Sequence, residues 1–470
     1  MTLALLIDFG STYTKLRAVD LQAAKIVASA QGPSMVKTDI NIGLDAALEA
    51  LKPQLGKRLN FKYRLASSSA AGGLRMITLG LVPDLTAKAA RQAALGAGAK
   101  VSATYSFELT LADLAEIIAS EPDIVLLSGG TDGGNRKVIV HNAQMIANSG
   151  LTCPVVIAGN RSAADEVAAI LSATQTRVIV SENVMPRHLE LNIEPAREAI
   201  RQVFIDHIIH AKGIDQAQAS VDAVLMPTPA AVLQGAQLLA DGTRDLTGLG
   251  PLLVVDIGGA TTDVHSICDG LPGDSGVIYH GLAEPHAKRT VEGDLGMRHT
   301  ARNIVHETGL QVFADDAGLD PLELETMLAR TDGDVEWLPD NDRERKFDRA
   351  LARAATRLAV TRHAGHHETV YSAHGPVTLQ RGKDLNEVET IIGTGGVLVH
   401  SQDAHAILST ALAGPDAPLA LRPKSAKMVV DKDYALYACG LLSSVAPDIA
   451  LRLGLNMLHK EEACHGVGSA

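Results

Sequence analysis

The sequence predicts an α/β protein built from two related domains. Two stretches share one pattern, LLIDFGSTYTKLRAVD (5–20) and LLVVDIGGATTDVHSI (252–267): an apolar strand, Asp-x-Gly, a hydroxyl-rich turn and a second alternating strand. Residues 123–183 alternate strands with a glycine loop and helices, the order of a mostly parallel sheet covered by helices. The 470 residues exceed one ordinary core, so at least two domains are expected.

The first half opens with three predicted strands between residues 3 and 30, joined by short turns as in an antiparallel meander. Residues 44–55 have the apolar spacing of a helix. A strand at 75–82 leads to Pro83, which opens a helix. Further helices are predicted at 109–122, 162–173 and 195–211, and also at 135–150, where a β-branched run leaves the assignment ambiguous.

The second half follows the second hairpin. Residues 281–389 are richer in charge, contain the only tryptophan and read mainly as helix, so we expect an inserted helical subdomain. The predicted divisions are a first domain at 1–150, a connecting part at 151–250, the second hairpin at 251–280, the insertion at 281–389, the end of the second domain at 390–455 and a flexible tail at 456–470.

The charge balance bears on the partners. The formal net charge is −12, and no block of Lys or Arg stands out. This argues against nucleic acid or an anionic membrane surface as a partner. A small phosphate pocket stays compatible with this balance, because it needs only local donors.

The predicted compartment is the cytoplasm. The four cysteines are scattered without a C-x-x-C pair, which favours free thiols and disfavours a zinc ribbon. No apolar run approaches about 20 residues, so no transmembrane helix is predicted. The opening MTLALLIDFG runs straight into Asp8, and we interpret it as a buried strand, not a signal peptide.

The first hairpin has the chemistry of a phosphate site. Gly10 permits close backbone approach, and the turn presents backbone N–H groups to an anion. Ser11 and Thr12 add hydroxyl donors, Lys15 can reach a terminal phosphate, and Asp8 is suited to a hydrated Mg²⁺. The alternative for one copy alone is an ordinary β-hairpin with a glycine turn.

The second hairpin repeats the pattern with a different charge at its end. Its residues are Asp256, Gly258, Gly259, Thr261, Thr262 and Asp263. Asp263 stands where the first copy has Lys15, and it is suited to positioning a water or a metal. Two such hairpins can clamp a polyphosphate, with metal held by Asp8 and Asp256.

The pair resembles the two phosphate motifs of the actin, Hsp70 chaperone and sugar kinase superfamily. DIGGATTDV resembles the Hsp70-type DLGGGTFDV, and MPTPAAVLQG (226–235) resembles the connecting helix EPTAAALAYG. GTGG (393–396) resembles the adenosine-binding loop, and DYALYACGLL (433–442) the closing helix. The resemblance implies duplicated actin-like ATPase domains of ribonuclease H-like fold, with Gly393, Gly395 and Gly396 at the adenosine.

Two further stretches, SSSAAGGLRMITLGLVPDLTAKAARQAALGAGAKV and SGGTDGGNRKVIVHNAQMIA, resemble the glutamate-mutase accessory proteins called MutL or GlmL. This resemblance implies ATP and Mg²⁺ as cofactors and subunits of an adenosylcobalamin-dependent mutase as partners. It implies a chaperone-like reactivating or assembly factor driven by nucleotide-dependent domain closure. Asp8 and Asp263 are then the catalytic residues; a homo-oligomer is left open.

One departure concerns catalysis. The Hsp70-type connecting helix has a Glu before its Pro, and this chain has Met226 there. A thioether cannot orient a water as a carboxylate does, and Glu182 and Glu194 do not match the position simply. ATP binding is therefore better supported than hydrolysis, and any ATPase activity is expected to be slow. The alternatives are a nucleotide-binding scaffold without turnover and, less favoured, a small-molecule kinase.

Two other features have competing interpretations. SGGTDGG (128–134) is interpreted as a relic of duplication or a structural turn, or else as a binding loop that uses Asp132 and Asn135. The histidines of RHAGHHETVYSAHG suggest a metal site, with His363 and His367 at i, i+4 spacing, but Gly365 weakens the helix. A solvated polar face is the favoured interpretation of these histidines.

Overall fold

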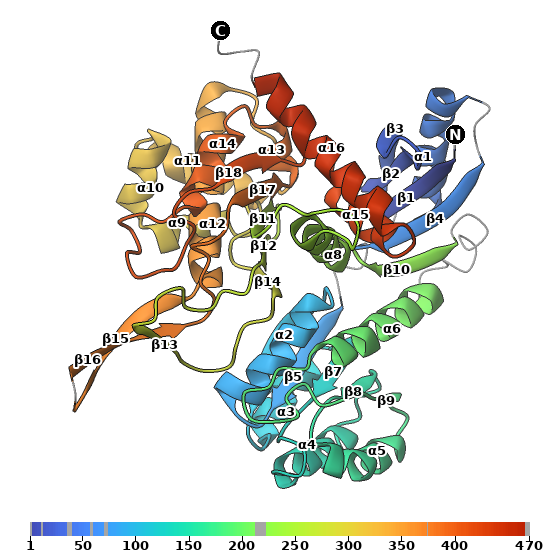
Figure 1. Cartoon of the computed structure of the whole chain (residues 1–470), viewed down its shortest axis with the longest axis vertical. Coiled ribbons are helices and arrows are strands. Elements are labelled where there is room, and N and C mark those ends of the chain that lie inside the picture. The colour runs from blue at the N-terminus through green and yellow to red at the C-terminus, as the bar shows by residue number, and fades with distance from the viewer. Residues whose placement is uncertain are drawn as a thin grey trace. The chain divides into compact units, whose positions relative to one another are not determined.

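The computed structural model divides the chain into two compact units (Figure 1). The structure describes residues 2–10, 13–34, 40–56, 60–69, 74–211, 222–373 and 375–465. Unit 1 comprises residues 1–235, 281–285 and 437–453, and unit 2 comprises 236–280, 286–436 and 454–470. No helix in the described ranges is both long and apolar enough to span a membrane.

Unit 1 contains the sheet that carries the first hairpin. Its strands are β1 (Leu3–Phe9), β2 (Tyr13–Asp20), β3 (Lys25–Pro33), β4 (Phe61–Ser68) and β10 (Ala223–Pro227), in the order β10-β4-β1-β2-β3. β1, β2 and β3 are antiparallel, which confirms the predicted meander, and β4 and β10 run parallel to β1. α1 (Ile40–Leu55) buries Leu44, Ala47 and Leu51, the apolar stripe that predicted it.

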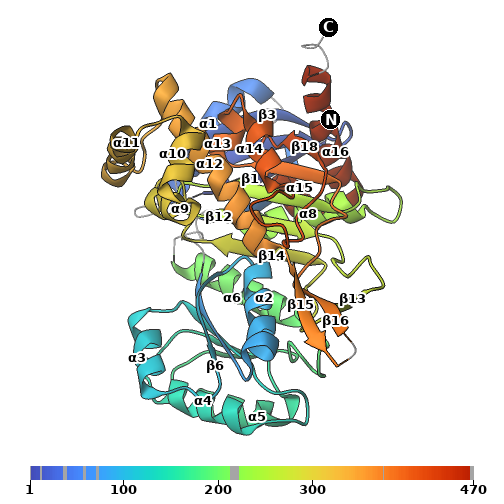
Figure 2. The ribbon, with the colours of Figure 1, turned by 90° about the vertical axis from the view of Figure 1, so that its left-hand side faces the viewer.

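A second, all-parallel sheet lies within unit 1; four of its strands are labelled in Figure 1 and the fifth, β6, in Figure 2. Its strands are β5 (Arg75–Gly80), β6 (Lys100–Ser106), β7 (Ile124–Leu127), β8 (Val155–Ile157) and β9 (Val178–Val180), in the order β6-β5-β7-β8-β9. All neighbours are parallel, so the predicted parallel sheet is confirmed. The predicted division at residue 150 falls inside this sheet, between β7 and β8.

Helices cover both faces of the parallel sheet. They are α2 (Lys88–Gly96), α3 (Leu111–Ala119), α4 (Lys137–Ala147), α5 (Ala164–Ser172) and α6 (Glu194–Ala211). Met76, Ile124 and Leu126 share a core with α2 and α6. Their neighbours along the strands, such as Ile77 and Val125, share a core with α3, α4 and α5. This alternation along each strand assigns the helices to two opposite faces.

The sheet of unit 2 repeats the first sheet of unit 1. Its strands are β11 (Leu252–Ile257), β12 (Thr262–Ile267), β14 (Ala287–Glu292), β17 (Thr390–Thr394) and β18 (Lys427–Val430), in the order β14-β12-β11-β17-β18. β11 is antiparallel to β12, β12 is antiparallel to β14, and β17 and β18 run parallel to β11. Order and directions match β3-β2-β1-β4-β10, so the predicted duplication is confirmed.

The helices of unit 2 share one core with this sheet. They include α9 (Ala301–Thr308), α10 (Leu310–Ala317), α11 (Pro321–Gly333) and α12 (Asp342–His363). Phe313, Trp337 and Phe347 pack with Val255 of β11 in a single cluster. The segment 281–389 predicted as an insertion also contains β14, a strand of the main sheet, and most of a three-stranded sheet of β13 (Val277–Tyr279), β15 (His366–Ser372) and β16 (Gly375–Arg381).

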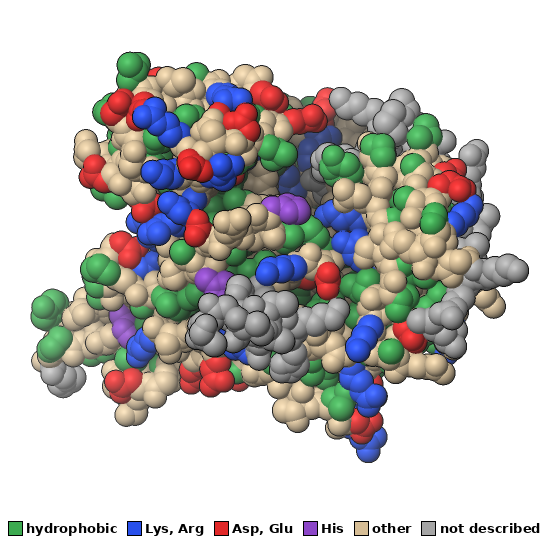
Figure 3. Space-filling model, turned by 90° about the horizontal axis from the view of Figure 1, so that it is seen from above, with side chains coloured by type: hydrophobic (Ala, Val, Ile, Leu, Met, Phe, Trp, Pro, Cys, Tyr) green, Lys and Arg blue, Asp and Glu red, His purple; other side chains and the backbone are tan. Residues whose placement is uncertain are grey.

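The other α-helices in the described part of the chain are α8 (Thr228–Asp241), α13 (Gly396–His400), α14 (Ala404–Leu408), α15 (Leu436–Ser443) and α16 (Pro447–His465). α15 overlaps the predicted closing helix (433–442) but begins three residues later. Residues 456–465 of the predicted tail are helical, and 466–470 lie outside the described residues. Acidic and basic side chains are interspersed on the face in Figure 3.

Candidate functional site: the two Asp-Gly hairpins

The first hairpin closes a tight turn after β1. The Gly10 N–H donates to the carbonyls of Asp8 at 3.0 Å and Tyr13 at 3.1 Å. A Cβ at Gly10 would lie 2.5 Å from the Tyr13 oxygen, so only glycine fits. Lys15 lies opposite Asp8 in the β1–β2 register. Ser11 and Thr12, the predicted hydroxyl donors, lie outside the described residues.

Two hydroxyl groups that the sequence did not point to hold the Asp8 carboxylate. Thr228 Oγ1, at the start of α8, donates to Asp8 Oδ1 at 2.6 Å. Ser67 Oγ, in β4, donates to the same oxygen at 3.4 Å. Burial raises the pKa of the Asp8 carboxyl, and Lys15 and the two hydroxyl groups oppose that shift. The two hydroxyl donors hold the buried carboxylate in one orientation, which suits a cation site.

The structure places Met226 beside this carboxylate cluster. Met226 lies in β10, is buried, and pairs with Ser67 across the sheet. No carboxylate occupies this position, and the hydroxyl of Thr228 reaches Asp8 instead. The only sequence feature that could have indicated this contact was Thr228 within the MPTP motif. Its hydrogen bond to Asp8 forms because β1, β4 and β10 are neighbours in the sheet.

The second hairpin pairs two carboxylates. Asp256 of β11 lies opposite Asp263 of β12 in the register. Asp263 is held by Arg289 of β14, with Nε at 2.8 Å and Nη2 at 2.5 Å from Oδ1, and it accepts from Thr261 Oγ1 at 3.0 Å. The sequence did not indicate Arg289 as a partner of Asp263, because the two residues come together only when β14 pairs with β12. The ion pair fixes the Asp263 carboxylate by charge-assisted hydrogen bonds.

Backbone contacts brace the glycine turn of the second hairpin. The Gly258 N–H donates to the Thr261 carbonyl at 2.9 Å, and the Gly259 carbonyl accepts from the N–H groups of Arg298 at 2.8 Å and His299 at 3.0 Å. Thr262 Oγ1 donates to the Leu295 carbonyl at 2.7 Å. Thr262 is thus a structural hydroxyl, whereas Thr261 orients Asp263.

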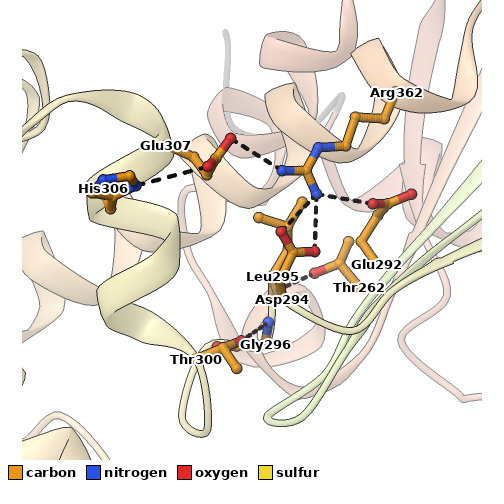
Figure 4. Close-up of polar contacts among 9 residues, drawn as sticks. All are labelled: Thr262, Glu292, Asp294, Leu295, Gly296, Thr300, His306, Glu307 and Arg362. Carbon is orange, nitrogen blue, oxygen red and sulfur yellow. Dashed lines mark hydrogen bonds and ion pairs between the residues drawn. The ribbon is translucent and has the colours of Figure 1, made fainter. Parts of the chain in front are cut away.

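Arg362 anchors the segment that braces this turn (Figure 4). Its guanidinium pairs with Glu292 at 3.0 Å, Asp294 at 2.9 Å and Glu307 at 3.3 Å. Next to Asp294, the Gly296 N–H donates to Thr300 Oγ1 at 2.7 Å. The Arg362 side chain of α12 therefore links β14, α9 and the segment 294–299, whose residues Arg298 and His299 donate to the Gly259 carbonyl of the hairpin.

The GTGG loop lies directly against the second hairpin. Gly395 has φ +94°, and a Cβ there would lie 2.3 Å from the Ile257 oxygen and 2.9 Å from Asp256 Oδ1. Only glycine allows the loop to come this close to the carboxylate. Gly396 begins α13. Gly393 lies inside β17 against Leu408, so its role is packing.

The predicted site residues thus form two groups, one in each unit. Unit 2 brings together the second hairpin, Asp256, Asp263 and Gly395, and unit 1 brings together Asp8, Gly10 and Lys15. Within the described ranges, no three His, Cys, Asp or Glu side chains form a metal-binding cluster. A Mg²⁺ at Asp8 or Asp256 fits this donor set, because Mg²⁺ usually keeps several waters and takes only one or two carboxylates.

His363 and His367 do not share a helix face as the metal hypothesis required, and the favoured solvated face holds for the exposed His366 but not for His363. His363 is fully buried, with Nε2 2.8 Å from Ser266 Oγ and Nδ1 2.8 Å from Thr290 Oγ1. Burial holds its pKa well below the usual value. His367 lies on β15, not on the helix of His363, and His374 lies outside the described residues. His363 is therefore neither a metal ligand nor part of a solvated face.

The duplicated sheets, each opening with an Asp-x-Gly hairpin, define a protein of the actin-like ATPase class with ribonuclease H-like domains. The sequence model of the family described as "MutL protein" matches residues 4–458, and the chain belongs to this family. It is 48% identical over 450 residues to "Protein MutL" of Clostridium tetanomorphum, covering 96% of this chain and 97% of that protein.

Among solved structures, the chain is similar to component A of the (R)-2-hydroxyglutaryl-CoA dehydratase of Acidaminococcus fermentans, with 10% identity, a TM-score of 0.30 and coverage of 97% and 100%. It is also similar to the activator of the 2-hydroxyisocaproyl-CoA dehydratase of Clostridium difficile with bound ADPNP, with 10% identity, a TM-score of 0.30 and coverage of 97% and 98%. A xylulose kinase of Bifidobacterium adolescentis matches with 12% identity, a TM-score of 0.32 and coverage of 96% and 93%.

Proposed function

We propose that this protein binds ATP with Mg²⁺ through its two Asp-Gly hairpins and its GTGG loop. The observation that supports the proposal is the close approach of the GTGG loop to the second hairpin, since a Cβ at Gly395 would lie only 2.9 Å from Asp256 Oδ1. In this proposal Asp8 and Asp256 hold the hydrated cation, Lys15 contacts a phosphate and Asp263 positions a water. The bound Mg²⁺ supplies neutralisation of phosphate charge.

The accessory role rests on the family. We propose that the protein serves an adenosylcobalamin-dependent mutase of the glutamate mutase type, as a chaperone-like factor that helps reactivation or assembly. Nucleotide drives such a role only if it binds one arrangement of the protein better than another. Mixing purified mutase, its inactivated cofactor, ATP and Mg²⁺ with this protein is expected to restore activity, and absence of recovery would contradict the role.

Calorimetric titration of the full chain with ATP and Mg²⁺ tests binding. Thr228→Val removes the 2.6 Å hydrogen bond to Asp8, and a hydrogen bond to a charged group is worth enough to weaken Mg²⁺-dependent binding about tenfold. Thr228→Ser keeps the hydroxyl and is expected to bind like the wild type. A wild-type chain that binds no ATP would overturn the proposal.

A scaffold without turnover is the second candidate. The buried thioether of Met226 favours it, because no carboxylate stands there to orient a water. A long incubation with ATP and Mg²⁺, followed by measurement of ADP, separates the two. Tight binding without ADP supports the scaffold, and steady slow ADP formation supports the ATPase.

A further inference from the structure

The parallel sheet of unit 1 has a topological switch point. In sequence order its strands are arranged 2-1-3-4-5, because β6 and β7 flank β5 and β8 and β9 follow. The connection after β5 enters α2 on one face, and the connection after β7 enters α4 on the other. Loops that leave neighbouring strands for opposite faces open a crevice at the carboxyl edge, where sheets of this order bind ligands.

The loop after β7 brings backbone donors to this edge. Gly129 (φ +143°) and Gly130 (φ +73°) are buried. Within the described part of the chain, the backbone N–H groups of Gly129, Gly130 and Thr131 have no hydrogen-bond acceptor. Unpaired N–H groups at buried positions are costly, and successive N–H groups of this kind suit an anion.

Side chains from the following loops hold this donor loop in place. Asp132 Oδ1 accepts from the Arg161 N–H and from Asn183 Nδ2, both at 2.9 Å. Asn160 Oδ1 accepts from the Gly133 N–H at 3.0 Å, and Asn183 Nδ2 also donates to the Gly130 carbonyl at 3.0 Å. Asp132 therefore stabilises the conformation of the loop, and these hydrogen bonds preorganise the loop for a ligand.

An aromatic side chain stands at the same edge in a strained backbone. Phe107, just after β6, has φ +68° and is 58% exposed. Its N–H donates to the Leu81 carbonyl at 3.3 Å, and its carbonyl accepts from Asn142 Nδ2 at 3.0 Å. Leu81 also borders the donor loop, with Cβ 3.8 Å from the Cβ position of Gly129. A bulky residue at positive φ that exposes its ring indicates a functional constraint.

We propose that this edge is a second ligand site, separate from the two hairpins, for a small molecule with a phosphate group and a planar ring. The N–H groups of residues 129–131 bind the phosphate, and the ring of Phe107 packs on the planar part. The duplication-relic interpretation of SGGTDGG is wrong, because the strand that corresponds to β17 in unit 1 is β4, not β7.

Amide NMR of the full chain, with flavin mononucleotide as the probe and riboflavin as its phosphate-free match, tests the proposal. We expect flavin mononucleotide to give saturable shifts at the amides of residues 129–131, inorganic phosphate to give weaker ones, and riboflavin to give none. The shifts should persist when ATP and Mg²⁺ saturate the protein. Absence of shifts at these amides, or equal shifts with riboflavin, overturns the site.

Two variants sharpen the test. Thr131→Pro removes one donor N–H and should weaken flavin mononucleotide binding about tenfold, whereas Thr131→Ala keeps the N–H and should bind normally. Phe107→Gly relieves the positive φ, so it should raise the melting temperature while reducing affinity for flavin mononucleotide to that for inorganic phosphate. Unchanged affinity in Phe107→Gly contradicts the role of the ring. Failure of ATP binding is observed separately, at the amides of Gly258 and Gly395.

Discussion

Asp8 combines deep burial with a set of hydrogen-bond donors. A carboxyl whose pKa is raised in the folded protein binds a proton more tightly there than in the unfolded chain. Its contribution to stability is therefore full below the unfolded pKa, near 3.8, and is lost as pH rises through the folded pKa. Ionising this buried carboxyl therefore costs stability, and a bound cation would offset that cost.

We expect Asp8→Asn to raise the melting temperature at pH 7, because the amide keeps an oxygen for Thr228 and Ser67 and removes the buried charge. The gain should shrink as pH falls, because the wild-type carboxyl then takes up a proton in the folded protein. Calorimetric melting of both proteins between pH 5 and 8 measures this. A gain that grows toward acidic pH would contradict the raised pKa, and ATP binding with Mg²⁺ should be lost in the variant.

Arg289 and Asp263 form a buried ion pair. Their side chains are 5% and 13% exposed. Removing one partner leaves a buried charge, so Arg289→Met should lower the free energy of unfolding by about 3 to 5 kcal/mol. Asp263→Asn combined with Arg289→Met should recover much of this loss. Urea denaturation measures both.

The matched control is Arg349→Met. Arg349 forms an ion pair with Asp403, and both side chains are well exposed. It should change stability by no more than about 1 kcal/mol. Equal losses at Arg349 and Arg289 would show that burial does not set the strength of the Asp263 pair.

At the scale of elements, a close helix contact joins α8 and α15 within unit 1. A Cβ at Gly440 would lie 1.9 Å from the Ala231 carbonyl oxygen. Gln234 Nε2 of α8 also donates to Ser443 Oγ of α15 at 3.0 Å. The helix that carries Thr228 is therefore held by the predicted closing helix, which connects the carboxyl-terminal part of the chain to the Asp8 cluster.

Gly440→Ala should force these helices apart and lower the free energy of unfolding by about 1 to 3 kcal/mol. Gly333→Ala is the control, because Gly333 is also helical and has open space around its Cβ position. That variant should be neutral or stabilising by up to about 1 kcal/mol. Thermal unfolding compares them, and a stable Gly440→Ala would show that the backbone contact can relax.

At the scale of the whole molecule, each unit carries one copy of the same five-stranded sheet and one Asp-x-Gly hairpin. ATP with Mg²⁺ is therefore expected to slow amide hydrogen exchange in both hairpins and in the GTGG loop. Exchange in β15 and β16, which carry no predicted ATP-binding or Mg²⁺-binding residue, should stay unchanged. Protection confined to one hairpin would contradict a role for both.

The sequence by itself determined the duplicated hairpins, the meander, the GTGG loop and the closing helix, because these depend on local patterns of apolar, glycine and hydroxyl residues. It also placed Asp8, Gly10 and Asp256 at strand ends. The close approach of Gly395 to Asp256 was not predicted, since it depends on the pairing of strands far apart in the chain.

Only the tertiary structure decided which side chains surround the carboxylates. Thr228 and Ser67 meet Asp8, and Arg289 meets Asp263, because parallel and antiparallel pairing puts distant strands in one register. Because His363 is buried, it is a core residue and not a metal ligand. Because β7 belongs to the parallel sheet, the SGGTDGG loop lies at the edge of that sheet and is not a counterpart of the GTGG loop. Register and strand order are properties of the whole fold, so no local pattern contains them.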